Sequence, residues 1–124
     1  MKSTHPINLA LRFLLELAAI FAFGYWGHSL GVDGMQILLA ILFPLLFAVL
    51  WGVFAVRGDP SRSGKTVVHT PGIVRLLLEL ILFGAAAWMM LDLDYSWIAL
   101  IFGSAVVILY FISFDRIAWL LKQK

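Results

Sequence analysis

"LRFLLEL", residues 11–17, and "VRLLLEL", residues 74–80, each place an arginine and a glutamate four positions apart within a run of leucines. Positions four apart share one face of an α-helix and lie about 6 Å apart along its axis. One offset aligns the two stretches, because 75 − 12 and 79 − 16 both equal 63. We therefore expect two apolar helices that carry the same pair of charges.

The composition around these stretches is that of a membrane protein. Of the 124 residues, 63% are hydrophobic and 13% are charged, and the mean hydropathy is +1.00. A soluble domain is about half apolar and a quarter charged. Four apolar windows are each long enough to cross a bilayer core of roughly 30 Å, and they cover residues 8–28, 35–55, 72–91 and 95–114.

These windows predict an all-α membrane protein with four transmembrane helices in an antiparallel bundle. The chain would form a single domain, residues 1–124, with a polar connection at residues 56–70 and an interfacial tail at residues 115–124. Because each half contains two spans, the 63-residue offset predicts two tandem helical hairpins related by a pseudo-twofold axis along the membrane normal. Convergence of two membrane helices on a similar pattern is the alternative to this internal duplication.

The distribution of charge predicts the orientation. All nine lysines and arginines fall on one side of the predicted map, namely Lys2, Arg12, Arg57, Arg62, Lys65, Arg75, Arg116, Lys122 and Lys124. The two short loops on the other side carry only Asp33, Asp92 and Asp94. The positive-inside rule therefore places both termini in the cytoplasm. Anionic lipid headgroups on that face are a sufficient partner for the basic residues, and no nucleic acid is needed to explain them.

The four paired charges, Arg12, Glu16, Arg75 and Glu79, are the candidate functional site. A structural role would join the first and third spans, with Arg12 against Glu79 and Arg75 against Glu16. Alternatively, Glu16 and Glu79 would form the binding site of a small solute or cation transporter or channel, since charged residues inside membranes are commonly functional. A neighbouring arginine favours the charged form of a carboxylate and makes it a poorer proton carrier, which favours the structural role.

Small residues predict where helices pack closely. They recur along the second span as Ala40, Pro44, Ala48 and Gly52, and along the fourth as Ala99 and Gly103.

Other candidates for chemistry are weak. Trp51 and His28 are candidates for lining a cavity, although anchoring at a membrane interface is their ordinary role. The chain has no cysteine, and its histidines are separated by sequence and by membrane side, so we expect no metal site and no cofactor. No acid, base and nucleophile converge, and we expect no enzyme.

Three stretches together resemble a known family. They are "NLALRFLLELAAIFAFGYWG" at residues 8–27, "LWGVF" at 50–54 and "RLLLELILFGAAA" at 75–87. They resemble the YrdB-like proteins, small bacterial four-helix membrane proteins of unknown function, and the resemblance spans nearly the whole chain. It implies a multi-pass protein of the bacterial cytoplasmic membrane with no assigned activity and no catalytic residues to carry over. We therefore expect a structural or assembly element, with a homo-oligomer or another membrane protein as possible partners.

Overall fold

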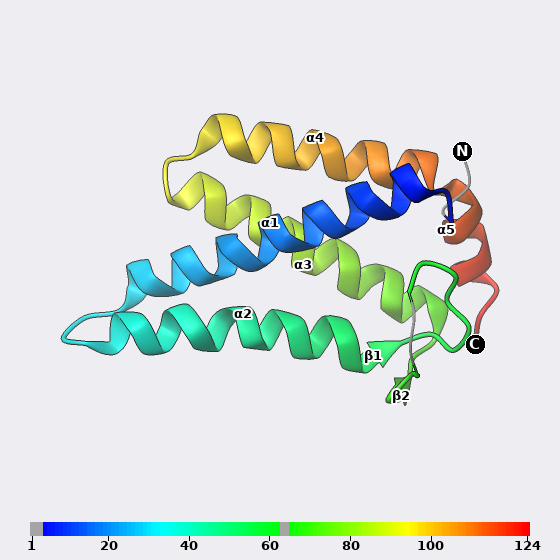
Figure 1. Ribbon diagram of the computed structural model, residues 1–124, viewed down its shortest axis with the longest axis horizontal. Helices are drawn as coiled ribbons and strands as arrows, with labels where there is room; N and C mark the ends of the chain where they lie inside the picture. The colour runs from blue at the N-terminus through cyan, green and yellow to red at the C-terminus, as the bar shows by residue number, and fades with distance from the viewer. Residues whose placement is uncertain (1–3, 63–64) are drawn as a thin grey trace.

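The computed structural model describes residues 4–62 and 65–124 as a helical protein with one short strand pair (Figure 1). Lys2 and residues 63 and 64, which fall within the predicted connection, lie outside the described residues. The elements in chain order are α1 (Pro6–Leu30), α2 (Met35–Val53), β1 (Phe54–Ala55), β2 (Val68–His69), α3 (Gly72–Asp92), α4 (Ser96–Ile112) and α5 (Phe114–Leu121).

Three of these helices, α1, α2 and α3, are each long and apolar enough to cross a membrane. Their bounds agree with the first three predicted windows to within about two residues, the usual uncertainty of helix ends. In the described chain, α4 has 17 residues and adds a fourth candidate span only when it is taken together with α5, whose axis is bent by 69° from that of α4. The structure is thus all-helical in class and consistent with a multi-pass membrane protein.

The last window, residues 95–114, also agrees with one helix to within about two residues, since α4 runs from Ser96 to Ile112. A break then separates α4 from α5. The break lies at Ser113, whose hydroxyl donates to Asn8 Oδ1 at 2.9 Å and whose carbonyl accepts from the amide of Arg116 at 2.9 Å. The following residues start α5 in a new direction. The predicted tail is therefore a short helix that buries Arg116 and Leu120 against the protein.

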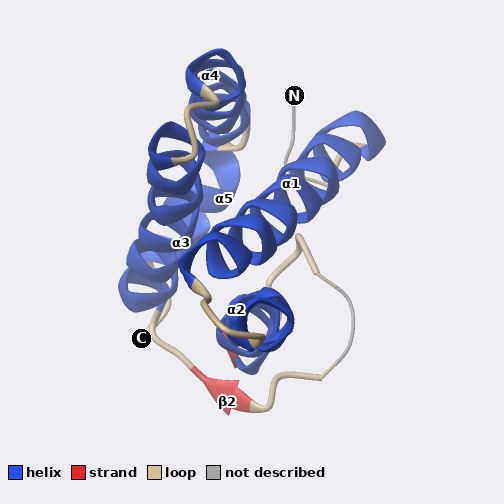
Figure 2. Cartoon of the chain, turned by 90° about the vertical axis from the view of Figure 1, so that its left-hand side faces the viewer, coloured by secondary structure: helices blue, strands red, loops and turns tan. Residues whose placement is uncertain are grey.

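The long helices are arranged around α1, which packs against α2, α3 and α4. Figure 1 shows both termini, α5 and the strand pair at one end, and the turns from α1 to α2 and from α3 to α4 at the other. The end-on view of Figure 2 shows α3 and α4 on one side of α1 and α2 on another. The predicted paired charges lie on α1 and α3, in the half of each helix that is nearer the end with α5.

The apolar core lies between α1, α3 and α4, with Phe47 contributed by α2. Phe83 is buried at its centre, and its ring contacts those of Trp51, Phe102 and Tyr110 at centroid distances of 5.0, 5.9 and 6.3 Å. Edge-to-face pairs of this kind are favourable beyond the area that they bury. Phe47 is the one residue of α2 that is buried, so most of this helix is left uncovered by the described protein.

Only part of the predicted small-residue stripe faces a neighbouring helix. A Cβ on Gly24 of α1 would lie 3.3 Å from both the Ala40 carbonyl and the Pro44 ring, which places those two residues of α2 against α1. Ala48 is exposed, and among the described atoms nothing lies within 4 Å of a Cβ on Gly52. The close contacts of α1 with α2 are made by Gly24 and Gly27, in the half of α1 nearer the turn between the two helices.

Of the two small residues of α4 that were predicted to pack closely, Ala99 and Gly103, only one is buried. Ala99 is buried in the core. A Cβ on Gly103 would meet no described atom within 4 Å, so this glycine does not make the close helix contact that was predicted. Gly27 of α1, which was not singled out, makes a closer approach to α2 than Gly24 does: a Cβ there would lie 2.4 Å from the Leu39 carbonyl.

The polar connection is held at both of its ends. Phe54 pairs with Val68 and Ala55 with His69 in a short parallel ladder. The amide of Gly72, at the start of α3, donates to the Gln123 carbonyl at 3.0 Å. These bonds draw the connection and the segment after α5 to the start of α3.

Candidate functional site

Glu79 of α3 lies at the centre of the candidate site and is completely buried, with 0% of its surface exposed. Its Oε2 accepts from Arg12 Nη2 at 2.7 Å and from Arg75 Nε at 2.8 Å. Its Oε1 accepts from the hydroxyl of Tyr110 at 2.6 Å. Bonds from charged donors to a buried carboxylate are the strong class of hydrogen bond.

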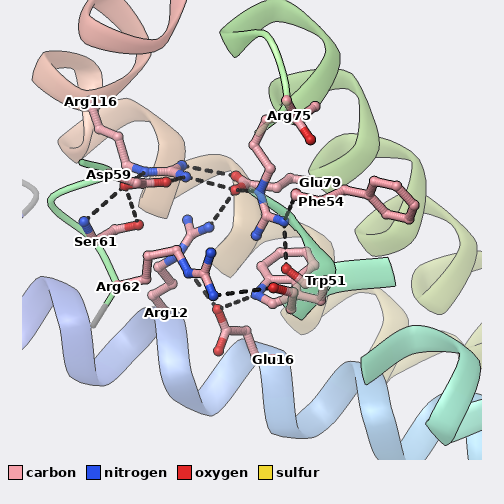
Figure 3. A network of polar contacts seen from close by, with 12 residues as sticks. Arg12, Glu16, Trp51, Phe54, Asp59, Ser61, Arg62, Arg75, Glu79 and Arg116 are labelled. Atoms are coloured by element: carbon pink, nitrogen blue, oxygen red, sulfur yellow. Dashed lines mark hydrogen bonds and ion pairs between the residues drawn. The ribbon is translucent and has the colours of Figure 1, made fainter. Parts of the chain in front are cut away.

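Arg116 of α5 joins Glu79 to a second acid. Its Nη1 and Nη2 donate to Glu79 at 2.9 and 2.7 Å, while its Nε and Nη2 donate to the two carboxylate oxygens of Asp59 at 3.0 and 2.6 Å. Figure 3 shows this guanidinium between the two acids. Asp59 also accepts from the amide and hydroxyl of Ser61 at 2.9 and 2.8 Å. One side chain thereby connects α3, α5 and the polar connection.

Asp59 lies outside the membrane-spanning helices, and its pKa is lowered in the folded protein. Burial alone raises the pKa of this carboxyl. The hydrogen bonds and positive charge of Arg116, with the bonds from Ser61, outweigh burial and hold the pKa below its ordinary value. The acid is therefore charged in the folded protein at neutral pH.

Arg75 links the acids to the end of α2. Its Nη1 donates to the carbonyls of Trp51 and Phe54 at 2.5 and 2.6 Å. Carbonyls in the last turn of a helix have no partner within the helix, and a cation there satisfies them. The guanidinium also lies 4.8 Å from the ring centroid of Trp51, as a cation–π pair.

Glu16 occupies a different environment from Glu79. Its side chain is 23% exposed. Its Oε1 accepts from Trp51 Nε1 at 2.9 Å and lies 3.5 Å from Arg12 Nε. The two glutamates of the repeated pair are therefore not equivalent: one is saturated with donors, whereas the other retains access to the surface.

Six residues together form what we call the charge cluster: Arg12, Glu16, Asp59, Arg75, Glu79 and Arg116. It contains three guanidinium groups and three carboxylates, so their formal charges cancel. Each carboxylate faces at least one guanidinium group, an arrangement that repels a metal cation. Chemically, the cluster is suited to holding segments together.

A partly open cavity of about 500 Å³ borders the cluster. Its walls are Leu9, Arg12, Phe13 and Glu16 of α1, Trp51 and Gly52 of α2, Pro60, Ser61 and Arg62 of the connection, and Arg75 of α3. Trp51, one of the two candidates for lining a cavity, lies in this wall. His28 lines a separate cavity of about 470 Å³ with Gly24, Ala40 and Pro44 near the outer turn, so the two candidates do not share a site.

The structure brings together all four charges that the sequence singled out. Arg12 meets Glu79 across α1 and α3, but Arg75 pairs with Glu79 on its own helix. The predicted crosswise arrangement is therefore half present. It is asymmetric because Arg75 is also directed to the carbonyls that end α2.

Three members of the site were not predicted: Asp59, Tyr110 and Arg116. The sequence carried no clear signal for the charged pair, because Arg116 has an acid, Asp115, beside it in the chain and Asp59 lies in a polar segment among other charges.

Comparison with known proteins agrees with the resemblance noted from the sequence. Residues 10–121 match the model of a family described as "Protein of unknown function (DUF2568)". The chain is 35% identical over 123 residues to the "Uncharacterized protein YrdB" of Bacillus subtilis (strain 168), covering 99% of this chain and 100% of that protein. No solved structure matches the chain. The chain is therefore a member of the DUF2568 family, the YrdB-like proteins of unknown function.

Proposed function

We propose that the chain is a multi-pass protein of the bacterial cytoplasmic membrane whose charge cluster is a structural or assembly element. In this proposal α1, α2, α3 and the bent α4–α5 pair form four antiparallel spans. Both termini and the connection at residues 56–70 face the cytoplasm, where the basic residues contact anionic headgroups. The start of α1, the strand pair and the C-terminus lie at one end, which supports their sharing one side of the membrane, and the positive-inside rule supplies which side (Figure 1). We assign no catalytic step to the chain.

The environment of Glu79 carries the proposal. This carboxylate is fully buried and takes bonds from arginines of α1, α3 and α5 and from Tyr110 of α4. A carboxylate that moves protons or cations must alternate between charged and neutral states or between partners. Three guanidinium groups oppose such a change, because removing one partner from a buried ion pair costs about 3–5 kcal/mol. The geometry therefore favours a fixed joint between helices.

An assembly role is compatible with the uncovered surface of α2. Its apolar side chains are exposed along most of the helix, with Phe47 as the buried exception. Lipid covers such a surface in a monomer, and a second copy of the chain or another membrane protein covers it in an assembly.

The second candidate function is a small transporter or channel, and one observation favours it. Glu16 lines the cavity and is partly exposed, so it has the access to solvent that Glu79 lacks. A transport function would therefore use Glu16 as the exchanging group, with Glu79 as its fixed neighbour.

The internal duplication remains part of the proposal. The shared offset of the two charged pairs supports two hairpins related by a pseudo-twofold axis along the membrane normal. The unequal environments of Glu16 and Glu79 then mean that the two copies have diverged. The copy with Glu79 holds the helices together, and the copy with Glu16 borders the cavity.

The two functions are separated by Glu16→Gln and Glu79→Gln in the full-length protein reconstituted in liposomes. Each variant is measured for thermal unfolding and for proton flux with a pH-sensitive dye inside the vesicle. A structural element predicts that Glu79→Gln lowers the melting temperature far more than Glu16→Gln and that no variant changes the flux. Flux that is present in the wild type and disappears in Glu16→Gln, with the melting temperature preserved, would refute the structural proposal in favour of transport.

A further inference from the structure

Arg62 is the third arginine in the cavity wall, after Arg12 and Arg75, and in the described part of the chain it is the one with a buried donor that lacks a partner. Its Nη2 donates to the Gly52 carbonyl at 3.2 Å. Its Nη1 is buried and meets no hydrogen-bond acceptor within residues 4–62 and 65–124. A buried donor on a charged group is costly without a partner, and native proteins nearly always provide one.

The other charges at the cavity do not supply that partner. Glu16, the acid in the cavity wall, already accepts from Trp51 and pairs with Arg12. The charge cluster is formally neutral before Arg62 is counted. Arg62 therefore gives the cavity an excess positive charge, and the group that complements it is an anion.

The shape and the remaining walls indicate which kind of anion. A volume of about 500 Å³ lies within the range of small-molecule sites, roughly 300–1,000 Å³. Ser61 and Arg62 form polar walls, while Leu9 and Phe13 of α1 form apolar ones. Phe13 is largely exposed on the outside of α1, so the apolar wall continues onto the surface of a predicted span. A ligand with a compact anionic group and an attached apolar part matches both kinds of wall.

We propose that this cavity binds a phosphate group, with Arg62 as its principal ligand. A guanidinium offers two parallel donors that match phosphate oxygens. The phosphate of an anionic phospholipid would place its acyl chains along Leu9 and Phe13, whereas a soluble phosphate ester would occupy the polar part alone. The lipid source rests on the membrane placement in the proposed function; the phosphate site does not depend on whether the cluster is structural or transports an ion.

The test is the binding of phosphatidylglycerol to the full-length protein in a neutral detergent, titrated by native mass spectrometry. Diacylglycerol, which has the same acyl chains but no phosphate, is the lipid control. Arg62→Gln is compared with Arg57→Gln, which removes the same charge from an exposed arginine of the same connection outside the cavity walls. Because a charged hydrogen bond is lost, we expect Arg62→Gln to weaken phosphatidylglycerol binding about tenfold or more, and Arg57→Gln less than about twofold.

A second arm adds glycerol 3-phosphate and inorganic phosphate as competitors. Failure of both to displace the lipid assigns the phosphate to a phospholipid, while displacement that depends on Arg62 upholds the phosphate site and assigns it to soluble esters. Should Arg62→Gln alter the melting temperature, Arg62→Met, which removes the charge and keeps an apolar side chain, replaces it in the comparison. The proposal is overturned if the position 62 variant binds phosphatidylglycerol like the wild type, if Arg57→Gln loses as much, or if diacylglycerol binds equally well.

Discussion

Replacing Arg116 by glutamine tests whether the charge cluster holds the helices together at the end where α5 lies. The change removes four hydrogen bonds, two to Glu79 and two to Asp59. A hydrogen bond to a charged group contributes about 1.5–3 kcal/mol, but these four share one guanidinium and are not additive. The measured cost of breaking a buried ion pair, about 3–5 kcal/mol, is the better guide. For a chain of this size we expect the melting temperature to fall by about 10 °C or more.

The assay is thermal unfolding of the purified full-length protein in detergent, followed by circular dichroism. Asp59→Asn and the double variant complete a double-mutant cycle, because Asp59 loses its charge partner when Arg116 is removed. We expect a coupling energy of about 1–3 kcal/mol, so that the double variant is more stable than the sum of the single changes implies. Arg57→Gln is the control for loss of a cation at this end. Additive effects, or a loss in Arg57→Gln equal to that in Arg116→Gln, would refute the reasoning.

Three further predictions concern single contacts. Gly27→Ala should destabilise the protein by about 1–3 kcal/mol, because the added Cβ lies 2.4 Å from a backbone carbonyl of α2. Gly84→Ala is the matched control, since a Cβ there meets no described atom within 4 Å. Equal melting temperatures of the two variants would contradict the packing of α1 against α2. Tyr110→Phe removes one bond to Glu79 and should cost about 1–3 kcal/mol in a denaturant titration, since the acceptor is charged, and no change would show that the bond is not formed. Because the folded pKa of Asp59 is below its ordinary value, its contribution is complete above that value and is lost as the pH falls through the folded pKa. Asp59→Asn should therefore flatten the acid limb of stability measured against pH, and an unchanged limb would count against this pKa.

The helices could be predicted from the sequence because their signal is local. Each apolar window is long enough to be recognised on its own, and each of the four agrees with one helix to within about two residues. The bend after Ile112 could not be found this way. It depends on the bond from Ser113 to Asn8, a residue of α1 that is 105 positions distant in the chain.

The charge cluster was predicted in its two repeated pairs because a charge in an apolar window is conspicuous. Asp59 and Arg116 lie in polar segments, where a single charge carries no such signal. Their pairing follows from the turn of α5, which is a tertiary feature. The close approach at Gly27 was missed for a similar reason, because which small residue touches a neighbour depends on the crossing of α1 and α2.

The difference between Glu16 and Glu79 follows from the elements that surround them. Glu79 lies on α3, where α1, α4 and α5 can all direct a donor to it. Glu16 lies on α1 facing the end of α2, and the segment that would cover it from outside is the polar connection rather than a helix. The helices around Glu79 hold several donors in fixed positions, whereas the connection beside Glu16 leaves part of that carboxylate uncovered. The cavity therefore forms beside the less saturated glutamate, and Arg62 reaches it because the connection returns across the end of α2.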